Sequence, residues 1–261
     1  MTIGGFHHVT ALAGDAQQNL DFYTQSVGMH LVKRTVNYDD PGTHHFYYGD
    51  AQGLPGSLLT FFPWGRLRKP QRGAGQPVAI ALAGSEDRTI LDPDGIELQF
   101  VARKDAAGIC GATILESNLE AALRLLGETL GLQQVDPLRF RVAEDQYIDV
   151  LHDPHAPHVK MGAGIPHHIA LRAGTEESLL QWRARLIEAG LRVSAIRDRY
   201  YFHSVYFKHP AGTLFELATD GPGFAIDEPA DALGTSLCLP PWLGPHRTEI
   251  AERLTPVQFP T

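Results

Sequence analysis

Cysteine is scarce in this sequence, with only Cys110 and Cys238 among 261 residues. Two widely separated cysteines exclude a disulfide framework and a thiolate metal site, so we expect both to be reduced packing residues. The sequence also lacks any apolar run near the roughly 20 residues that span a membrane, and its N-terminus lacks the basic-then-apolar layout of a signal peptide. These absences predict a compact cytoplasmic protein without a membrane partner.

Basic residues are also in deficit. The 30 acidic residues exceed the 22 basic ones, which gives a formal charge of −8. A net negative charge repels phosphate backbones and argues against a nucleic-acid partner. The apolar content of 43% suffices for one or two packed cores. Histidine, in contrast, is plentiful, with 13 residues.

Two histidine pairs open similar stretches of sequence. His7-His8 begins the strand-like run FHHVTAL, and His167-His168 begins a second run in residues 166–219, which ends with Glu216 in HPAGTLFELATD. The first stretch predicts one strand, then a helix, then three strands. Asp15 is placed to cap the helix and Gly28 to end it. The turn signals DDPG and GLPG separate the predicted strands, which are Met29–Tyr38, Thr43–Gly49 and Ser57–Phe62.

This βαβββ pattern recurs along the chain. The second copy is too short for a full helix and two strands between the predicted strands Pro77–Ala83 and Ile96–Ala102. The third has a capping box from Ser117 to Glu120. In the fourth, a helix begins near Thr175, and three strands follow at Arg192–Ile196, Ser204–Lys208 and Thr213–Thr219. We therefore predict four units and a tail, at residues 1–65, 66–105, 106–160, 161–222 and 223–261.

Internal repetition predicts an α+β fold of tandem βαβββ modules, because one unit exposes an apolar sheet face that a sister unit must cover. Paired units then form a curved mixed sheet around a cup. Strand alternation indicates which residues line that cup: if His8 faces inward, so does Thr10, whereas His7 and Val9 face away. The same alternation makes Glu216 a lone carboxylate between apolar neighbours.

A buried carboxylate needs a positive partner, and a divalent cation supplies one. Two histidines and one carboxylate, His8, His168 and Glu216, match a facial triad, which binds Fe(II) or Mn(II) and leaves positions open for substrate and dioxygen. Catalytic zinc is not excluded. In the simpler interpretation the histidines are hydrogen-bonded core residues and Glu216 belongs to an ion pair. The recurrence of the HH pair favours the metal.

Several motifs together resemble the vicinal-oxygen-chelate superfamily, specifically its ring-cleaving hydroquinone dioxygenase-like branch: the stretch from HHVTAL to HHFYYGD, LTFFPW, GIPHHIAL, DRYYFHSVYF, GTLFELATD and LPPWL. The resemblance implies four βαβββ modules, with the first and fourth paired around a metal held by His8, His168 and Glu216. Glyoxalase-like relatives take a fourth ligand from the last strand of the first module. This chain has Leu59 and Thr60 there, which favours a three-ligand open site.

The same resemblance points to four residues beside the metal. His7 and His167 adjoin the ligands and could shuttle protons, and Arg199 and Tyr206 could hold an anionic oxygen. Each also has a structural alternative: Tyr206 could cap a strand, Arg199 could pair with Asp198 or Asp220, and strand alternation points His7 and His167 away from the metal. The sequence does not decide whether His44 or His45 reaches the cup, and it makes His203 a pocket candidate.

The favoured hypothesis is an extradiol-type, ring-cleaving dioxygenase with Fe(II), or with Mn(II) as the second choice, that acts on a small hydroquinone-like or catechol-like aromatic and O₂. A second hypothesis is a glyoxalase-type isomerase or lyase with Ni(II) or Zn(II), which predicts a fourth protein ligand. A third is a metal-independent small-molecule binding protein. The exposed sheet edges and the apolar tail Leu237–Leu243 make a homodimer plausible.

Overall fold

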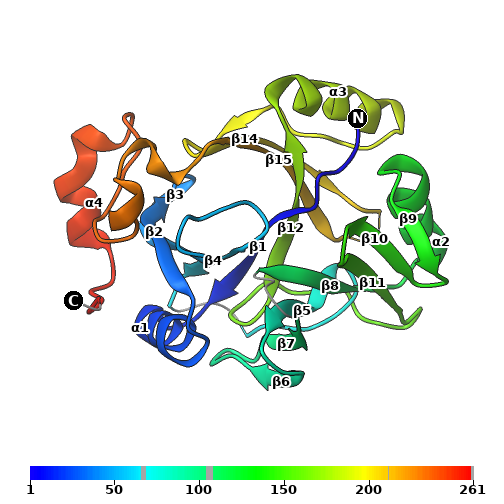
Figure 1. The fold of residues 1–261 in the computed structure, drawn as a ribbon, viewed down its shortest axis with the longest axis horizontal. Helices are drawn as coiled ribbons and strands as arrows, with labels where there is room; N and C mark the ends of the chain where they lie inside the picture. Colours follow the sequence, from blue (N-terminus) through cyan, green and yellow to red (C-terminus); the bar gives the residue numbers. More distant parts are fainter. Residues whose placement is uncertain (66–68, 104–107, 211, 260–261) are drawn as a thin grey trace.

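Two curved sheets make up most of the molecule (Figure 1), in a computed structural model that describes residues 1–65, 69–103, 108–210 and 212–259. The eight-stranded sheet has the order β13 (Arg197–Asp198), β14 (Phe202–Lys208), β15 (Leu214–Pro222), β12 (Pro166–Gly174), β1 (Phe6–Ala13), β4 (Leu58–Pro63), β3 (Asp40–Gly49) and β2 (His30–Asn37). The expected unit limits at residues 66, 105 and 106 lie outside the described ranges.

The seven-stranded sheet has the order β6 (Arg88–Leu91), β7 (Glu97–Ala102), β5 (Gln76–Gly84), β8 (Ile109–Glu116), β11 (Gln146–His152), β10 (Arg139–Ala143) and β9 (Gln133–Asp136). Each sheet is built around one antiparallel pair of first strands, β1 with β12 and β5 with β8. In each case the last strand of the unit pairs in parallel with the first, as in β1 with β4. This arrangement confirms the predicted α+β fold of βαβββ units.

The short second stretch has three strands. β5 ends at Gly84 and β6, a strand that the sequence did not indicate, begins at Arg88. Three intervening residues cannot hold a helix, and β6 forms the edge of its sheet. Compared with the other three stretches, the helix and one edge strand are missing.

The helices begin where a side chain can satisfy their first free N–H groups. Asp15 caps α1 (Ala16–Asp21) and Thr175 caps α3 (Glu176–Glu188), as predicted. The predicted cap of α2 (Leu119–Leu123) at Ser117 was wrong, because Asn118 accepts from the Ala121 N–H. α1 and α2 continue as π-helical turns at Phe22–Ser26 and Arg124–Thr129.

Two strand predictions also need correction. Asn37 pairs with Asp40, so the first hairpin turns at residues 38–39 and β3 already begins at Asp40 within DDPG. The expected strand Arg192–Ile196 is only a single bridge from Val193 to Phe207, followed by the two-residue β13. The Ser194 carbonyl oxygen accepts from Arg183 Nε, and the Tyr206 N–H donates to the Ser194 hydroxyl, so these two groups do not form a backbone hydrogen bond that would extend the pairing.

One apolar core joins both sheets. It takes alternate residues of the central strands, such as Val9, Ile169 and Phe215, and the inner face of α3 around Trp182. The residues between them, including His8, His168 and Glu216, therefore face the other side of the eight-stranded sheet. The core thus covers one face of this sheet and leaves the opposite face to the site.

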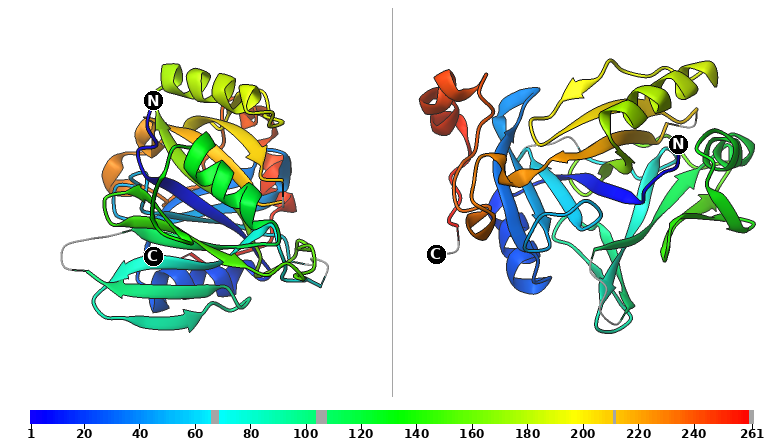
Figure 2. Two further views of the ribbon diagram at one scale, coloured as in Figure 1. Left: turned by 90° about the vertical axis from the view of Figure 1, so that its right-hand side faces the viewer. Right: turned by 45° about the horizontal axis from the view of Figure 1, so that its top comes forward.

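The tail from Gly223 onward runs beside β2 and β3, at the side of the molecule opposite α2 (Figures 1 and 2). It contains short 3₁₀ turns at Phe224–Ile226, Ala230–Ala232 and Gly244–His246, and ends in α4 (Arg247–Arg253). Leu239, Ile250 and Leu254 of the tail pack on Val36.

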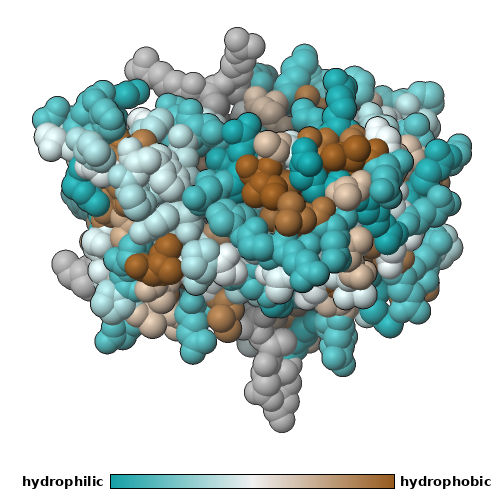
Figure 3. Space-filling model, turned by 90° about the horizontal axis from the view of Figure 1, so that it is seen from above, coloured by the Kyte–Doolittle hydropathy of each residue, from teal (hydrophilic) through white to brown (hydrophobic). Residues whose placement is uncertain are grey.

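The surface facing the viewer in Figure 3 is mainly hydrophilic, with apolar side chains in small separate groups. Within the described ranges, no helix is long and apolar enough to cross a membrane.

Candidate metal centre

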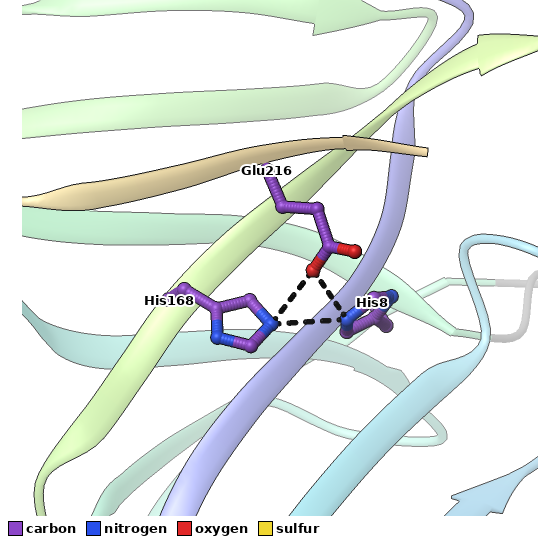
Figure 4. A group of neighbouring side chains, drawn as sticks. All are labelled: His8, His168 and Glu216. Carbon is purple, nitrogen blue, oxygen red and sulfur yellow. Dashed lines mark hydrogen bonds and ion pairs between the residues drawn. The ribbon is translucent and has the colours of Figure 1, made fainter. Parts of the chain in front are cut away.

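Three ligand-type side chains meet on the face of the eight-stranded sheet that lies opposite the apolar core (Figure 4). They come from neighbouring strands: His8 from β1, His168 from β12 and Glu216 from β15. The Nε2 atoms of the two histidines lie 3.1 Å apart, and Glu216 Oε2 lies 3.2 Å from His8 Nε2 and 2.9 Å from His168 Nε2. All three residues are buried. The residues that the sequence places 160 and 48 positions apart are thus brought to one point by strand pairing.

Each histidine pair contains a β-bulge. Phe6 pairs with Leu171 and His8 with Ala170, so His7 is an extra residue on β1. Likewise Thr10 pairs with His168 and Ala11 with Pro166, which makes His167 the extra residue on β12. A bulge re-aims a side chain that strict alternation would turn away.

Strand alternation would point His7 and His167 away unless the strand twists there, and the bulges supply that local distortion. The ring nitrogen Nδ1 of each lies against Nδ1 of the following ligand, at 2.9 Å for His7 with His8 and 2.7 Å for His167 with His168.

Hydrogen-bond partners define the tautomers on the His7 side. His7 Nε2 lies 3.1 Å from the Thr219 carbonyl oxygen, which can only accept, so Nε2 carries the hydrogen. His7 Nδ1 is then an acceptor and receives the hydrogen of His8 Nδ1. This leaves the lone pair of His8 Nε2 directed at Glu216 and His168. A residue that hydrogen-bonds to the second ring nitrogen of a histidine commonly orients that histidine for metal binding.

The electrostatics of the site favour a cation. Burial alone raises the pKa of the Glu216 carboxyl, whereas positive charge on the adjacent His8 and His168 rings would hold the pKa well below its ordinary range. Burial lowers the pKa of His168, so its ring is neutral near pH 7. Among the described residues, neither Glu216 oxygen has a hydrogen-bond donor. A buried carboxylate facing imidazole lone pairs is costly without a positive charge between them.

A pocket of about 320 Å³ opens beside the cluster. Its wall includes His8, His168, His167, Arg199 and Tyr206, together with Thr10, Asn37, Tyr38, Asp39, Asp40, His45, Tyr47, Phe62, Trp64 and Phe202. The three predicted residues His167, Arg199 and Tyr206 thus share one cavity with the cluster. His7 lies behind His8, between the Thr219 carbonyl and the Phe202 ring.

Arg199 and Tyr206 form one polar unit in the pocket. Arg199 Nε donates to the Tyr206 hydroxyl at 3.1 Å, and Arg199 Nη1 lies 3.0 Å from Asp39 Oδ2. Arg199 pairs with Asp39 rather than with either alternative partner, Asp198 or Asp220, and Asp220 pairs with Arg172. Burial lowers the pKa of Arg199, but Tyr206 and Asp39 more than compensate and raise it overall. Burial raises the pKa of Tyr206, so its hydroxyl keeps its proton and can donate.

His45 is a pocket residue whose role the sequence left open. It lies on β3, where His44 faces the tail and bonds to the Thr255 carbonyl oxygen. Alternation therefore turns His45 to the pocket. His203 does not line this pocket, because its ring pairs with Glu176 and lies 3.6 Å from Asp198.

Thr60, in the last strand of the first unit, bonds to the hydroxyl of Thr10 at 2.8 Å and to His45 Nε2 at 2.9 Å. In the part of the chain that the structure describes, the cluster on this sheet has only His8, His168 and Glu216 as ligand-type residues. These three side chains are the candidate metal ligands of the site.

The molecule thus combines a fold of paired βαβββ units with a buried His-His-Glu group that could hold a metal ion. The family model of the Glyoxalase/Bleomycin resistance protein/Dioxygenase superfamily matches residues 5–55 and 111–217, and the chain belongs to this superfamily.

Relatives with curated names extend the comparison. The chain is 36% identical to the "Putative ring-cleaving dioxygenase MhqO" of Bacillus subtilis, over 97% of this chain and 96% of the relative. It is 26% identical to the chlorohydroquinone/hydroquinone 1,2-dioxygenase of Sphingobium indicum, over 95% of each. The MhqO alignment runs over 302 positions against 261 residues here, so that relative has segments that this chain lacks.

Solved structures agree with the fold. A crystal structure of a "putative dioxygenase" from Bacillus subtilis superposes with a TM-score of 0.92 at 35% identity, over 98% of each chain. Glyoxalase I from Zea mays superposes with a TM-score of 0.62 at 15% identity, over 83% of this chain and 92% of that one. At 15% identity, the similarity to the Zea mays enzyme concerns the fold alone.

Proposed function

We propose that this protein is a metal-dependent, extradiol-type ring-cleaving dioxygenase that opens a hydroquinone-like or catechol-like aromatic with O₂. The observation that carries the proposal is the convergence of His8, His168 and Glu216 in a buried cluster beside a pocket of about 320 Å³. The names of the relatives support an oxygenase. Their agreement with the donor set makes this function the best supported one.

The donor set fits a hard to borderline divalent cation. Two imidazole nitrogens and one carboxylate oxygen, without a thiolate, suit Fe(II) first and Mn(II) second. When bound, such a metal supplies open coordination positions for a substrate oxygen and O₂, and electrons for their reaction. His8 and His168 would hold it through Nε2, and Glu216 through its carboxylate.

The residues around the cluster have separable tasks. Tyr206 keeps its proton and Arg199 its charge, so both can donate hydrogen bonds to an oxygen that becomes anionic. If His168 Nε2 is a ligand, His168 Nδ1 carries a hydrogen and donates to His167 Nδ1 at 2.7 Å. His167 then carries its own hydrogen on Nε2. We infer that His167 acts as a hydrogen-bond donor, whereas a general base would need a free lone pair.

The isomerase alternative requires a fourth protein ligand, and Thr60 is instead bonded to Thr10 and His45. A metal-free binding protein would not need the uncompensated carboxylate of Glu216, which is fully buried. We therefore retain the dioxygenase as the single proposal.

Reconstitution tests this proposal. The protein is loaded with Fe(II) without oxygen, then mixed with O₂ and small hydroquinones or catechols while oxygen and absorbance are recorded. We expect one O₂ consumed per ring-opened product, and no detectable turnover in His168→Ala because that variant loses a ligand. His152→Ala, at an exposed position, should match the wild type. Stoichiometric metal binding without oxygen uptake for any of these substrates would contradict the proposal.

A further inference from the structure

His45 is held rigidly in the pocket wall. Its ring lies between the rings of Tyr47, at a centroid distance of 4.1 Å, and Phe62, at 4.2 Å. Both aromatic residues also line the pocket. Two aromatic contacts on one imidazole fix its orientation, so the polar edge of the ring has a defined position relative to any ligand.

One ring nitrogen of His45 is occupied within the protein. His45 Nε2 lies 2.9 Å from Thr60 Oγ1, which lies 2.8 Å from Thr10 Oγ1. Within the described residues, His45 Nδ1 has no hydrogen-bond partner, so this nitrogen is available to bind a ligand. Burial lowers the pKa of His45 well below its usual value, which keeps the ring neutral.

Several other polar groups of the pocket are engaged by protein partners. Tyr206 and Arg199 bind each other, and Arg199 also pairs with Asp39. Asp40 accepts from the Trp64 indole and the Thr43 hydroxyl. His167 is tied to the ligand His168. His45 differs from these groups because, among the described residues, its Nδ1 has no hydrogen-bond partner.

A para-diol presents two oxygens at opposite ends of a ring, and only one of them can bind the metal. We propose that His45 Nδ1 binds the second hydroxyl of such a substrate and so makes the site selective for hydroquinones. A hydroxyl can donate or accept, so it suits either neutral tautomer of His45. This inference rests on the proposed function, because it assumes that one substrate oxygen lies at the metal.

A hydroxyl-binding residue should discriminate against the analogue that lacks the hydroxyl. The experiment measures anaerobic binding of hydroquinone and of phenol to the Fe(II)-loaded protein by titration calorimetry. We expect the wild type to bind hydroquinone about 10- to 100-fold more tightly than phenol. In His45→Phe, which retains the aromatic contacts but removes the ring nitrogens, the ratio should fall to about 1 to 3.

His44→Phe is the matched control, because the same substitution one residue earlier faces the tail and should retain the wild-type ratio. Metal stoichiometry is measured for every variant, and His45→Leu provides the same test if phenylalanine disrupts folding. A wild-type ratio in metal-loaded His45→Phe, or equal binding of both ligands by the wild type, overturns the role of His45.

The two proposals fail separately. Ring cleavage with an unchanged binding ratio overturns the role of His45 and retains the dioxygenase. The protein could instead take up no oxygen with any diol, while His45→Phe loses the preference for hydroquinone over phenol. That outcome supports hydroxyl recognition by His45 and overturns the dioxygenase proposal.

Discussion

His7 and His167 show why a pair of histidines, rather than one, opens each central strand. Strict alternation would send the first member of each pair to the apolar core. The bulge at His7 and at His167 instead places its ring against the next histidine ring, with the two Nδ1 atoms within hydrogen-bond distance. Its partner can then offer Nε2 outward. Under the proposed function, the dipeptide supplies a metal ligand together with the residue that sets its tautomer.

We predict that His7→Phe weakens Fe(II) binding about 10- to 100-fold, because His8 loses the acceptor that fixes its Nε2 lone pair. Competition with a chelator of known affinity measures the change, without any need for turnover. Since Phe retains the contact with Phe202, folding should be preserved. The exposed His155→Phe serves as control; equal affinities in the two variants would refute this role of His7.

The DPDG element at residues 92–95 is more than a turn between strands. Asp92 accepts from the backbone N–H groups of Asp94 and Ile96, and from the buried Tyr23 hydroxyl at 3.0 Å. Asp94 accepts from the Gly14 N–H. The turn thus connects the shortened stretch, which lacks a helix, to Gly14 and to the π-helical turn Phe22–Ser26 of the first unit.

We predict that Tyr23→Phe lowers the free energy of unfolding by about 1–2 kcal/mol, because it removes one donor to a buried carboxylate. Asp92→Ala, which also frees two backbone N–H groups, should cost about 3 kcal/mol. Urea unfolding of both single variants and the double variant gives the coupling between them. Additive effects would show that the Tyr23–Asp92 hydrogen bond contributes nothing to stability.

Polar side chains are buried at several places in the part of the chain that the structure describes, and imidazoles are among them. Glu116, Thr213 and His209 form one such group, with Glu116 on β8 accepting from Thr213 beside β15 and lying 3.0 Å from His209 Nδ1. This group links the two sheets. Burial is also the main cause that lowers the pKa of His44 and His45, and it lowers the pKa of His7 and His167 to about 3.

A histidine whose pKa is lowered in the folded protein makes the free energy of unfolding decrease as the pH decreases. Below its ordinary value of about 6.5 the unfolded chain binds a proton that the folded protein excludes, so each such group costs up to about 1.4 kcal/mol per pH unit. We predict that the metal-free protein loses stability from pH 6.5 downward, by urea unfolding at successive pH values. His45→Phe should show a shallower decline, whereas Phe62→Leu, which removes no titratable group, should keep the wild-type slope. Equal slopes for His45→Phe and the wild type would count against a neutral His45.

Local sequence determined much of this architecture. Apolar alternation and short turns specified most strands, and Asp15 and Thr175 specified two helix starts, because these signals act over a few residues. The tandem repeat gave the pairing of similar units, and the recurring HH pair with Glu216 indicated the donor set. The limits of the four units and the roles of the site residues stay predictions.

Only the tertiary structure decided what depends on register between distant strands. The pairing of β1 with β12 creates both bulges, and a bulge has no local sequence signal that separates HH from ordinary alternation. Arg199 meets Asp39 rather than its sequence neighbour Asp198, and His45 meets Thr60, because these partners come from other strands or hairpins. Sequence by itself thus supplied the chemical groups and their local elements, whereas strand register decided which of those groups touch.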